Sequence, residues 1–239
     1  MSRTLAKHRQ GRSSLRDPLL SNRDWRRLRT WYSEHGRRFP WRHKATPWSI
    51  LLAETLLHRT GANVAQDLYP LVRKAFPSPK SVVLKKDRWN SMLHKGGLFW
   101  RARIFVSACE DLVQHYGGHV PSERKELESL PGVGHYTASA VRCFGFGHRE
   151  FVTDTNTIRL AGRIAGKRLN PANHRTKSIQ ALIARLSDNG RPLLAEDNYA
   201  LLDLAATVCT PREPKCYKCP LSSSCHTGQL REGKNFSQQ

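Results

Sequence analysis

SLPGVGHYTASAVRCFGFGHREFVTDTNTIRLAGRIAG, residues 129–166, is the stretch that decides the fold of this chain. It predicts a short helix, a tight turn over residues 130–134 and a second helix from about His135. Gly132 and Gly134 permit positive φ and a close approach by another backbone. The N–H groups of such a turn open a helix N-terminus, where hydrogen bonds and the helix dipole favour a phosphate oxygen. An ordinary corner between two helices, with glycines for packing, is the alternative.

Two side chains close to this turn are candidates for chemistry. Tyr136 lies in the first turn of the second helix, and Asp154 follows in the run FVTDTNT, where a third helix should begin. In isolation, Asp154 would be interpreted as a plain N-cap. Its spacing from the turn, however, resembles that of the helix–hairpin–helix DNA glycosylases, in which this aspartate is catalytic. The resemblance also implies a catalytic-site position for Tyr136 and DNA contacts by the hairpin residues Gly132, Val133, Gly134, His135 and Thr137.

The composition points to a polyanionic partner. Lys and Arg total 40 against 19 Asp and Glu, which gives a formal net charge of +21 and a pI near 10.4. Such a surplus disfavours a compact fold unless a polyanion binds, so double-stranded DNA is the first candidate and an anionic membrane surface the second. The mean hydropathy is -0.58 and no apolar run is long enough to span a bilayer, so no membrane insertion is expected.

The N-terminus and the cysteines bear on the compartment. The basic start of the chain lacks the apolar segment of a secretory signal, although its Arg- and Ser-rich character leaves organelle targeting open. Four of the six cysteines crowd into one C-terminal cluster, which favours a reducing compartment. We expect a cytoplasmic, nucleoid-associated monomer in a prokaryote.

Helical periodicity runs through the whole chain. Apolar residues recur at helical spacing over residues 49–58, 64–76, 81–93, 100–116 and 123–129. No alternating strand pattern accompanies them, so an all-α fold is predicted. The resemblance implies two helical lobes with a DNA cleft between them, one a six-helix, barrel-like lobe and the other a lobe with an iron–sulfur cluster.

The same resemblance gives the expected domain boundaries. They are a basic disordered tail at 1–21, the N-terminal helix of the cluster lobe at 22–46, the six-helix lobe at 47–149 with its helix–hairpin–helix at 123–147, the cluster lobe at 150–230 and a C-terminal tail at 231–239.

Glu54 stands out because it is the one acidic residue in 35–66 and lies in the most apolar predicted helix. At about 100° per residue it projects between Ile50 and His58, where there is no broad polar face. A carboxylate in that setting is paired, protonated or lining a cleft. The alternative is a narrow wet stripe shared with Thr55 and His58.

The segment AETLLHRTGANV (53–64) resembles the one that supplies a catalytic acid in the adenine- and thymine-removing branches of the superfamily. That resemblance implies that Glu54 faces Asp154 across a base pocket. Two carboxylates in unlike settings suit cleavage of a glycosidic bond, since one can pass a proton while the other faces positive charge. DNA contacts are expected from His58, Arg59 and Thr60, and Arg59 or His58 would fill the gap left by the extruded base.

The C-terminal cysteines have the spacing C-x6-C-x2-C-x5-C, formed by Cys209, Cys216, Cys219 and Cys225. Four thiolates in one short loop predict a metal centre, and composition alone leaves zinc and an iron–sulfur cluster open. A pair of disulfides is the non-metal alternative. The spacing closely resembles the loop of the endonuclease III-like glycosylases, which implies a 4Fe–4S cluster as the cofactor.

Position 136 bears on the reaction. Relatives that also cut the strand carry a lysine nucleophile there, whereas a tyrosine cannot form a Schiff base, so a monofunctional glycosylase using water is expected. The adenine branch has a long additional C-terminal domain, and this chain ends soon after Cys225. The resemblance is therefore greatest to the thymine/uracil glycosylases that act opposite guanine.

The segment HRTGA (58–62) leaves the exact base open, because family members vary there. Excision of a modified cytosine, or of adenine opposite a damaged guanine, are the alternatives within the superfamily. A DNA-binding module without catalysis is the alternative from another class.

Overall fold

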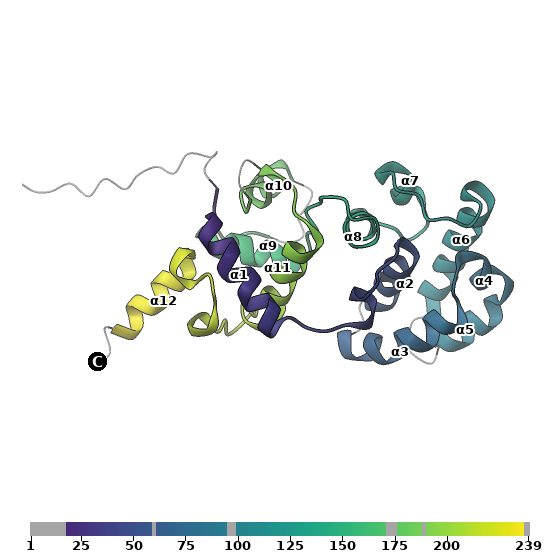
Figure 1. Cartoon of the computed structure of the whole chain (residues 1–239), viewed down its shortest axis with the longest axis horizontal. Coiled ribbons are helices and arrows are strands. Elements are labelled where there is room, and N and C mark those ends of the chain that lie inside the picture. Colours follow the sequence, from purple (N-terminus) through teal and green to yellow (C-terminus); the bar gives the residue numbers. More distant parts are fainter. Residues whose placement is uncertain (1–17, 59–60, 95–98, 171–175, 188–189, 237–239) are drawn as a thin grey trace, which may run out of the picture.

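The computed structural model describes residues 18–58, 61–94, 99–170, 176–187 and 190–236, so the predicted DNA contacts Arg59 and Thr60 lie outside the described residues. Helices dominate the described chain (Figure 1), and its β pairing is an isolated antiparallel bridge between Glu150 and Leu193. The prediction of an all-α fold is therefore confirmed.

The helices follow one another with short links. The first part of the chain contains α1 (Asn22–His35), a 3-10 turn η1 (Pro40–Arg42), α2 (Pro47–Leu57), α3 (Ala62–Ala75), α4 (Pro79–Leu84), α5 (Lys86–His94) and α6 (Phe99–Tyr116). The second part contains α7 (Arg124–Ser129), α8 (His135–Ala140), a π-helical turn (Val141–Gly145), α9 (Thr155–Ile164), α10 (Lys177–Ala184), α11 (Ala195–Thr207), the 3-10 turns η5 (Cys216–Lys218) and η6 (Ser222–Ser224), and α12 (His226–Phe236). None of the helices in these described ranges is long and apolar enough to cross a bilayer.

Polar caps explain where several helices begin. The Thr46 hydroxyl accepts the backbone N–H of Ser49 at 3.1 Å, and Pro47 occupies the first helical position of α2. Ser78 and Pro79 repeat the arrangement at α4. These short local signals fix the starts of helices that packing alone would leave less defined.

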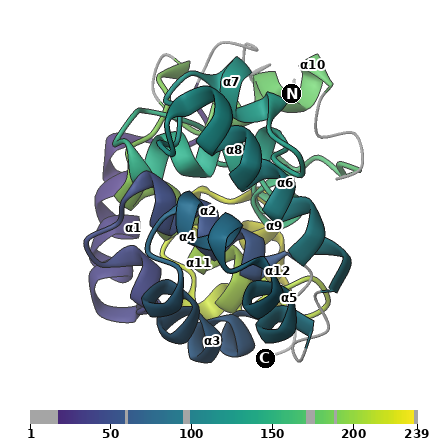
Figure 2. The same ribbon diagram turned by 90° about the vertical axis from the view of Figure 1, so that its right-hand side faces the viewer.

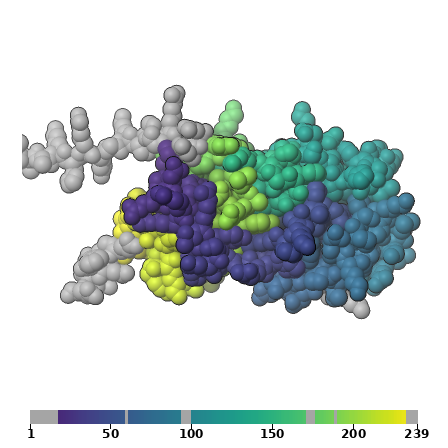
Figure 3. Space-filling view, viewed as in Figure 1, coloured from purple at the N-terminus to yellow at the C-terminus, as the bar shows by residue number. Residues whose placement is uncertain are grey.

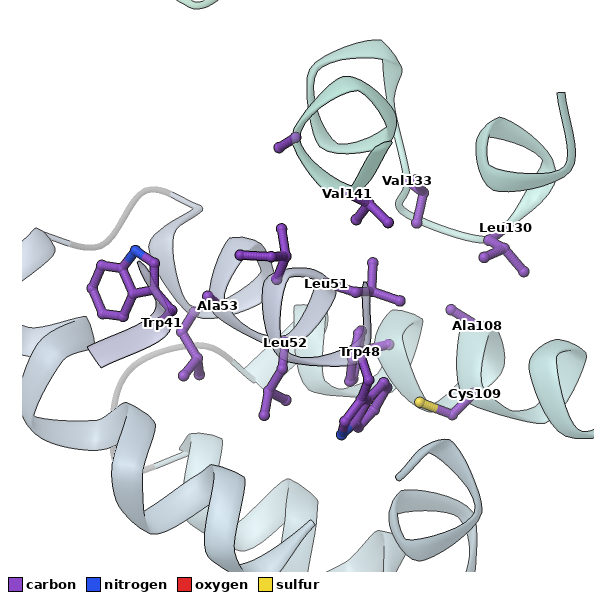
Figure 4. Packing of buried hydrophobic residues seen from close by; sticks show 14 of the residues in the cluster. Trp41, Trp48, Leu51, Leu52, Ala53, Ala108, Cys109, Leu130, Val133 and Val141 are labelled. Atoms are coloured by element: carbon purple, nitrogen blue, oxygen red, sulfur yellow. The ribbon is translucent and has the colours of Figure 1, made fainter. Parts of the chain in front are cut away.

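Helix α2 lies at the centre of the first lobe. Seven of its eleven residues are buried, because it faces α3, α8 and the π-helical turn on different sides. Leu51 of α2 points toward Val133 and Val141 (Figure 4), so the hairpin is packed onto this helix. Figure 2 looks onto this lobe and shows α3 and α5 on one side of α2 and α7 and α8 on the other.

A second hydrophobic core joins the N-terminal helix to the last third of the chain. It contains Trp25 and Leu28 of α1 together with buried residues of α9, α10, α11 and the cysteine-rich loop. The indole N–H of Trp25 donates to the carbonyl of Leu186 at 3.1 Å. Segments far apart in sequence therefore share one lobe, as Figure 1 shows by the purple helix lying among green and yellow elements.

Two boundaries differ from the sequence-based expectation. The folded chain begins before residue 22, since Leu20 is 1% exposed and the N–H of Leu19 donates to the carbonyl of Arg185 at 2.6 Å. The helix expected over 81–93 is two helices, which meet at Lys85 with φ -126°. The break turns Trp89 inward, where its ring N–H reaches the carbonyl of Ala102 at 3.0 Å.

The hairpin between α7 and α8 depends on two glycines. Gly132 has φ +76°, and a Cβ there would lie 2.7 Å from Cγ2 of Ile104. Gly145, at the end of the π-helical turn, would place a Cβ 2.6 Å from Cα of Pro47. The first glycine allows the turn itself, and the second lets the segment after α8 lie against the start of α2.

Candidate active site

A cavity of about 770 Å³ opens between the two lobes. Residues of α2 and α8 form its first wall, and the N-terminus of α9 and one face of α11 form the second. The predicted site residues that line it are Glu54, His58, His135, Tyr136, Thr137 and Asp154. Gly132 and Val133 line a smaller neighbouring cavity of about 70 Å³, and Gly134 is the N-cap of α8. The fold thus gathers both carboxylates and the phenol around one space, with the hairpin turn at a neighbouring cavity.

Asp154 is both the N-cap of α9 and a wall of this cavity. Its Oδ1 accepts the backbone N–H groups of Asn156 at 3.0 Å and Thr157 at 2.7 Å. Its Oδ2 accepts the side-chain amide of Asn156 at 2.8 Å. Three N–H donors at the positive end of a helix hold the carboxylate in one orientation. The capping interpretation and the cavity position are therefore compatible.

Glu54 projects from α2 toward the same space. Burial raises the pKa of its carboxyl from 4.5 to about 8, the negative charge of Asp154 adds to the rise, and the Arg42 guanidinium opposes it. The two carboxylates therefore sit in unlike settings, one held by N–H donors and the other desolvated. Near neutral pH, Glu54 carries a proton that it can give away.

Tyr136 lines the cavity together with the two acids. Burial raises the pKa of its phenol well above the usual 10, and the charges of Glu54 and Asp154 add to this rise. The phenol is therefore neutral, and its hydroxyl can donate a hydrogen bond. It offers no amine to the cavity.

A buried ion-pair cluster behind the cavity was missed by the sequence analysis. The carboxylate of Asp203, fully buried on α11, accepts from Arg42 Nη1 at 2.8 Å and Nη2 at 2.9 Å. The Arg37 side chain donates to the same carboxylate from Nε at 2.8 Å. An acidic residue inside the apolar run ALLDLAAT is the same signal that singled out Glu54, so Asp203 could have been found.

Aromatic rings and two polar groups without partners complete the wall. Tyr199 stacks on Phe144 with centroids 4.0 Å apart, and the Arg42 guanidinium lies 4.3 Å above the Tyr199 ring. Two buried atoms, Nε of Arg42 and the hydroxyl oxygen of Tyr199, have no hydrogen-bond partner among the described residues. A buried donor without a hydrogen bond lowers the stability of the fold by about 1–3 kcal/mol. Both groups would therefore gain from donating to an acceptor that enters the cavity.

The four clustered cysteines surround a second, mostly apolar cavity next to α9. Cys209, Cys216, Cys219 and Cys225 all line it, and all four are free thiols. Burial raises the pKa of Cys219 to about 12, and the three neighbouring thiols add to the rise. Thiols in such a space ionise readily only with a cationic centre beside them. No group of three or more His, Cys, Asp or Glu in the described ranges is close enough to hold a single metal ion.

A short chain of hydrogen bonds connects the two cavities. The Asn156 amide that donates to Asp154 accepts in turn from Arg159 Nη1 at 2.9 Å. Arg159 Nε then donates to the carbonyl of Cys209 at 3.1 Å. The orientation of Asp154 is thereby tied to the cysteine-rich loop, a relation that sequence spacing did not reveal.

Comparison with known proteins places this geometry in context. The profile of the helix-hairpin-helix motif matches residues 115–144. The chain is similar to a thymine-DNA glycosylase of Aeropyrum pernix, with 33% identity over 84% of this chain and 92% of that protein. It is also similar to a thymine/uracil-DNA glycosylase of Methanothermobacter thermautotrophicus, with 34% identity over 82% of this chain and 89% of that protein. The solved structure of a thermostable thymine-DNA glycosylase superposes with a TM-score of 0.77 and 30% identity, covering 86% and 95% of the two chains.

Proposed function

This chain belongs to the helix–hairpin–helix superfamily of DNA glycosylases, and from that premise we propose that it hydrolyses the N-glycosidic bond of a thymine or uracil paired with guanine. The product is an abasic site in an intact strand, which begins base excision. The enzyme acts on double-stranded DNA as a monomer, in the cytoplasm of a prokaryote.

One observation carries the proposal: Glu54, Asp154 and Tyr136 line a single cavity beside a turn suited to phosphate. A duplex held by the N–H groups of the hairpin would present its backbone next to this opening. The target base must leave the stack to enter, at a cost of a few kcal/mol that is least for a mismatch. The cavity of about 770 Å³ has room for an extruded nucleotide.

The two carboxylates take different roles in the reaction. Glu54 is protonated near neutral pH, so it donates a proton to the departing base. Asp154, oriented by three N–H donors, faces the positive charge that develops on the sugar and orients the attacking water. This division follows from the two environments rather than from the residue type.

The cavity wall favours hydrolysis over strand cleavage. Strand cleavage through an imine needs an amine at the sugar, and no lysine is among the described residues that line the cavity. Tyr136 stands at the position of the lysine in strand-cutting relatives. Its neutral phenol is suited to stacking on the extruded nucleotide or donating a hydrogen bond to it.

The two unpaired donors favour a base with carbonyl oxygens. Thymine and uracil present the acceptor oxygen O4 where cytosine carries an amino donor. Arg42 Nε–H and the Tyr199 hydroxyl can each donate to such an oxygen once the base enters. They match thymine or uracil better than a modified cytosine that keeps its amino group.

The cysteine-rich loop is proposed to hold a 4Fe–4S cluster. Zinc lies about 2.3 Å from each thiolate, which requires a compact group of sulfurs. The described residues form no such compact group, whereas the four cysteines encircle one apolar cavity. When bound, the cluster would join Cys209, Cys216, Cys219 and Cys225 as a structural centre. The loop would then keep Arg159, and through it Asn156, in place behind Asp154.

Single-turnover excision on a panel of duplexes tests the proposal. The panel contains G·T, G·U, A·T, guanine opposite modified cytosines, and adenine opposite oxidised guanine. We expect rapid excision from G·T and G·U and none from A·T. Preferred excision of a modified cytosine or of adenine would reassign the substrate, and excision of no base would favour a DNA-binding module.

A further inference from the structure

Helix α1 carries a second surface feature, separate from the active-site cavity. An open groove of about 770 Å³ runs between its outward face and the segment before α12, and it shares no lining residue with the active-site cavity. The lining residues are Arg23, Arg26, Arg27, Thr30, Trp31 and Glu34 of α1, with Pro220, Ser222 and Ser223 of the cysteine-rich loop. Figure 3 shows α1 (purple) lying beside the C-terminal segment (yellow) on this face of the molecule.

The groove lies across α1 from the active site. Leu28 and Tyr32 share one stripe of the helix, where Leu28 is buried and the Tyr32 hydroxyl lies 3.5 Å from Arg42 in the cavity wall. Arg23 and Arg27 share another stripe, which faces the groove. A duplex in the active-site cleft would therefore have α1 between itself and the groove.

The arginines of the groove occupy positions that are electrostatically unfavourable for a helix. Arg23, Arg26 and Arg27 stand three and four residues apart near the N-terminus of α1, where like charges repel and the helix dipole disfavours cations. All three are exposed. The charge of Arg27 acts on the nearby Asp24 carboxylate, whose pKa it helps to lower, and Arg27 Nη1 also donates to Ser223. Glu34, at the far end, lies 3.8 Å from His35. The N-terminal half of the groove is thus lined by three cations and no carboxylate among the described residues.

We propose that this groove binds the phosphate backbone of a second DNA segment while the active-site cleft holds the first. Guanidinium groups and serine hydroxyls are the usual donors to phosphate oxygens, and Ser223 is already positioned by a 3.0 Å bond from Arg27 Nη1. Trp31, half-buried in the groove, adds an aromatic surface beside the cations. Duplex DNA is the polyanion that this enzyme already binds, so a second stretch of the same backbone is the proposed occupant. An acidic protein segment, whose carboxylates could accept from the same donors, is an outcome of the test below.

A second backbone site has a consequence for the search along DNA. An enzyme that grips two segments can pass from one to the other without release into solution, because the new contact forms before the old one breaks. The inference does not depend on which base is excised.

A bridging assay tests the proposal. Full-length enzyme is saturated with a donor-labelled duplex carrying a non-hydrolysable abasic analogue, and energy transfer to an acceptor-labelled undamaged duplex is measured. The variant is Arg23→Gln/Arg26→Gln/Arg27→Gln, and the control is Lys80→Gln/Lys85→Gln/Lys86→Gln, which removes the same charge from exposed lysines of the first lobe. A third protein, Arg23→Lys/Arg26→Lys/Arg27→Lys, keeps the charge of the groove.

We expect the glutamine variant of α1 to lose bridging. The slope of log K for the second duplex against log salt concentration should become shallower by about two to three, because three phosphate contacts are removed. Its single-turnover excision should match wild type, which also shows that it folds. The lysine-to-glutamine control and the arginine-to-lysine variant should still bridge. Equal bridging by both glutamine variants would overturn the proposal, as would loss of excision in the α1 variant. Displacement of the second duplex by polyglutamate at lower charge concentration than by unlabelled DNA would assign the groove to an acidic protein segment instead.

Discussion

At the scale of single residues, the cavity places two carboxyl groups, those of Asp154 and Glu54, in different environments. Asp154 is held by three N–H donors at a helix start, while Glu54 is desolvated on an apolar helix and its pKa rises to about 8. Both side chains are carboxyls, and the proposed difference in their roles follows from these two environments. Tyr136, in the wall of the same cavity, stays neutral because burial raises the pKa of its phenol.

The raised pKa of Glu54 predicts a pH dependence. Excision should fall as the pH rises through about 8, because the proton donor is lost. Glu54→Gln should lower single-turnover excision by about 10²–10⁴-fold and remove this alkaline limb. A wild-type rate that stays level through pH 9 would remove Glu54 from proton donation.

The same shift has a consequence for stability. Between the ordinary pKa of 4.5 and about 8, the folded chain keeps a proton on Glu54 that the unfolded chain loses. The contribution of this group to the free energy of unfolding is therefore present at low pH and lost as pH rises through that window. Urea unfolding of wild type and Glu54→Gln across the window should diverge, and parallel curves would contradict the assignment.

Replacement of Tyr136 by lysine tests whether the enzyme lacks strand cleavage because no amine faces the sugar. Tyr136→Lys should gain some strand cleavage and a covalent adduct on borohydride trapping, because the new amine would face the sugar. Tyr136→Phe is the matched control and should give no adduct. An adduct at substantial yield from wild type would instead show that one of the enzyme's own lysines reaches the sugar.

At the scale of elements, the hairpin shows why glycine is needed at one position and not at the next. Gly132→Ala should lower the free energy of unfolding by about 1–3 kcal/mol, because φ +76° is strained for alanine and Cβ would lie 2.7 Å from Ile104. Gly134→Ala is the control, since φ is -92° and nothing lies within 4 Å of its Cβ. Denaturant unfolding measures both, and equal losses would show that the hairpin does not pack in this way.

The cysteine-rich loop makes a chemical prediction. Protein purified without oxygen should be brown and contain about four irons with acid-labile sulfide per chain. Cys216→Ser should lose colour and iron together, and its melting temperature should fall because the loop no longer supports α9. Colourless wild-type protein with one zinc per chain would replace the cluster by a single-ion site.

The sequence predicts features that depend on residues close together in the chain better than features that depend on contacts between distant segments. The caps, the hairpin and the cysteine spacing are local patterns that can be recognised in the sequence. Helix α2 can be predicted as a buried helix because it is apolar on nearly every side. The Arg42–Asp203 pair joins residues 161 positions apart, so its partner choice depends on how α11 docks. The unpaired hydroxyl of Tyr199 is likewise set by that docking and by stacking on Phe144. The break at Lys85 was missed because the apolar period continues through it.

At the scale of the whole molecule, each of the two hydrophobic cores supports a different set of site residues on its side of one cavity. The first lobe supplies Glu54, Tyr136 and the hairpin, and the second supplies Asp154 with the cysteine-rich loop behind it. The net charge of +21 brings the polyanion to both lobes. Binding is therefore distributed over the surface, while the chemistry is concentrated in a few side chains.

Asp154→Asn separates these two properties most directly. Asparagine caps a helix about as well as aspartate, so folding and duplex affinity should be retained. We measure single-turnover excision of thymine from a G·T duplex together with the dissociation constant for the same duplex. We expect that excision falls by about 10²–10⁴-fold or more while affinity stays near that of wild type. Excision at the wild-type rate in the asparagine variant would contradict it.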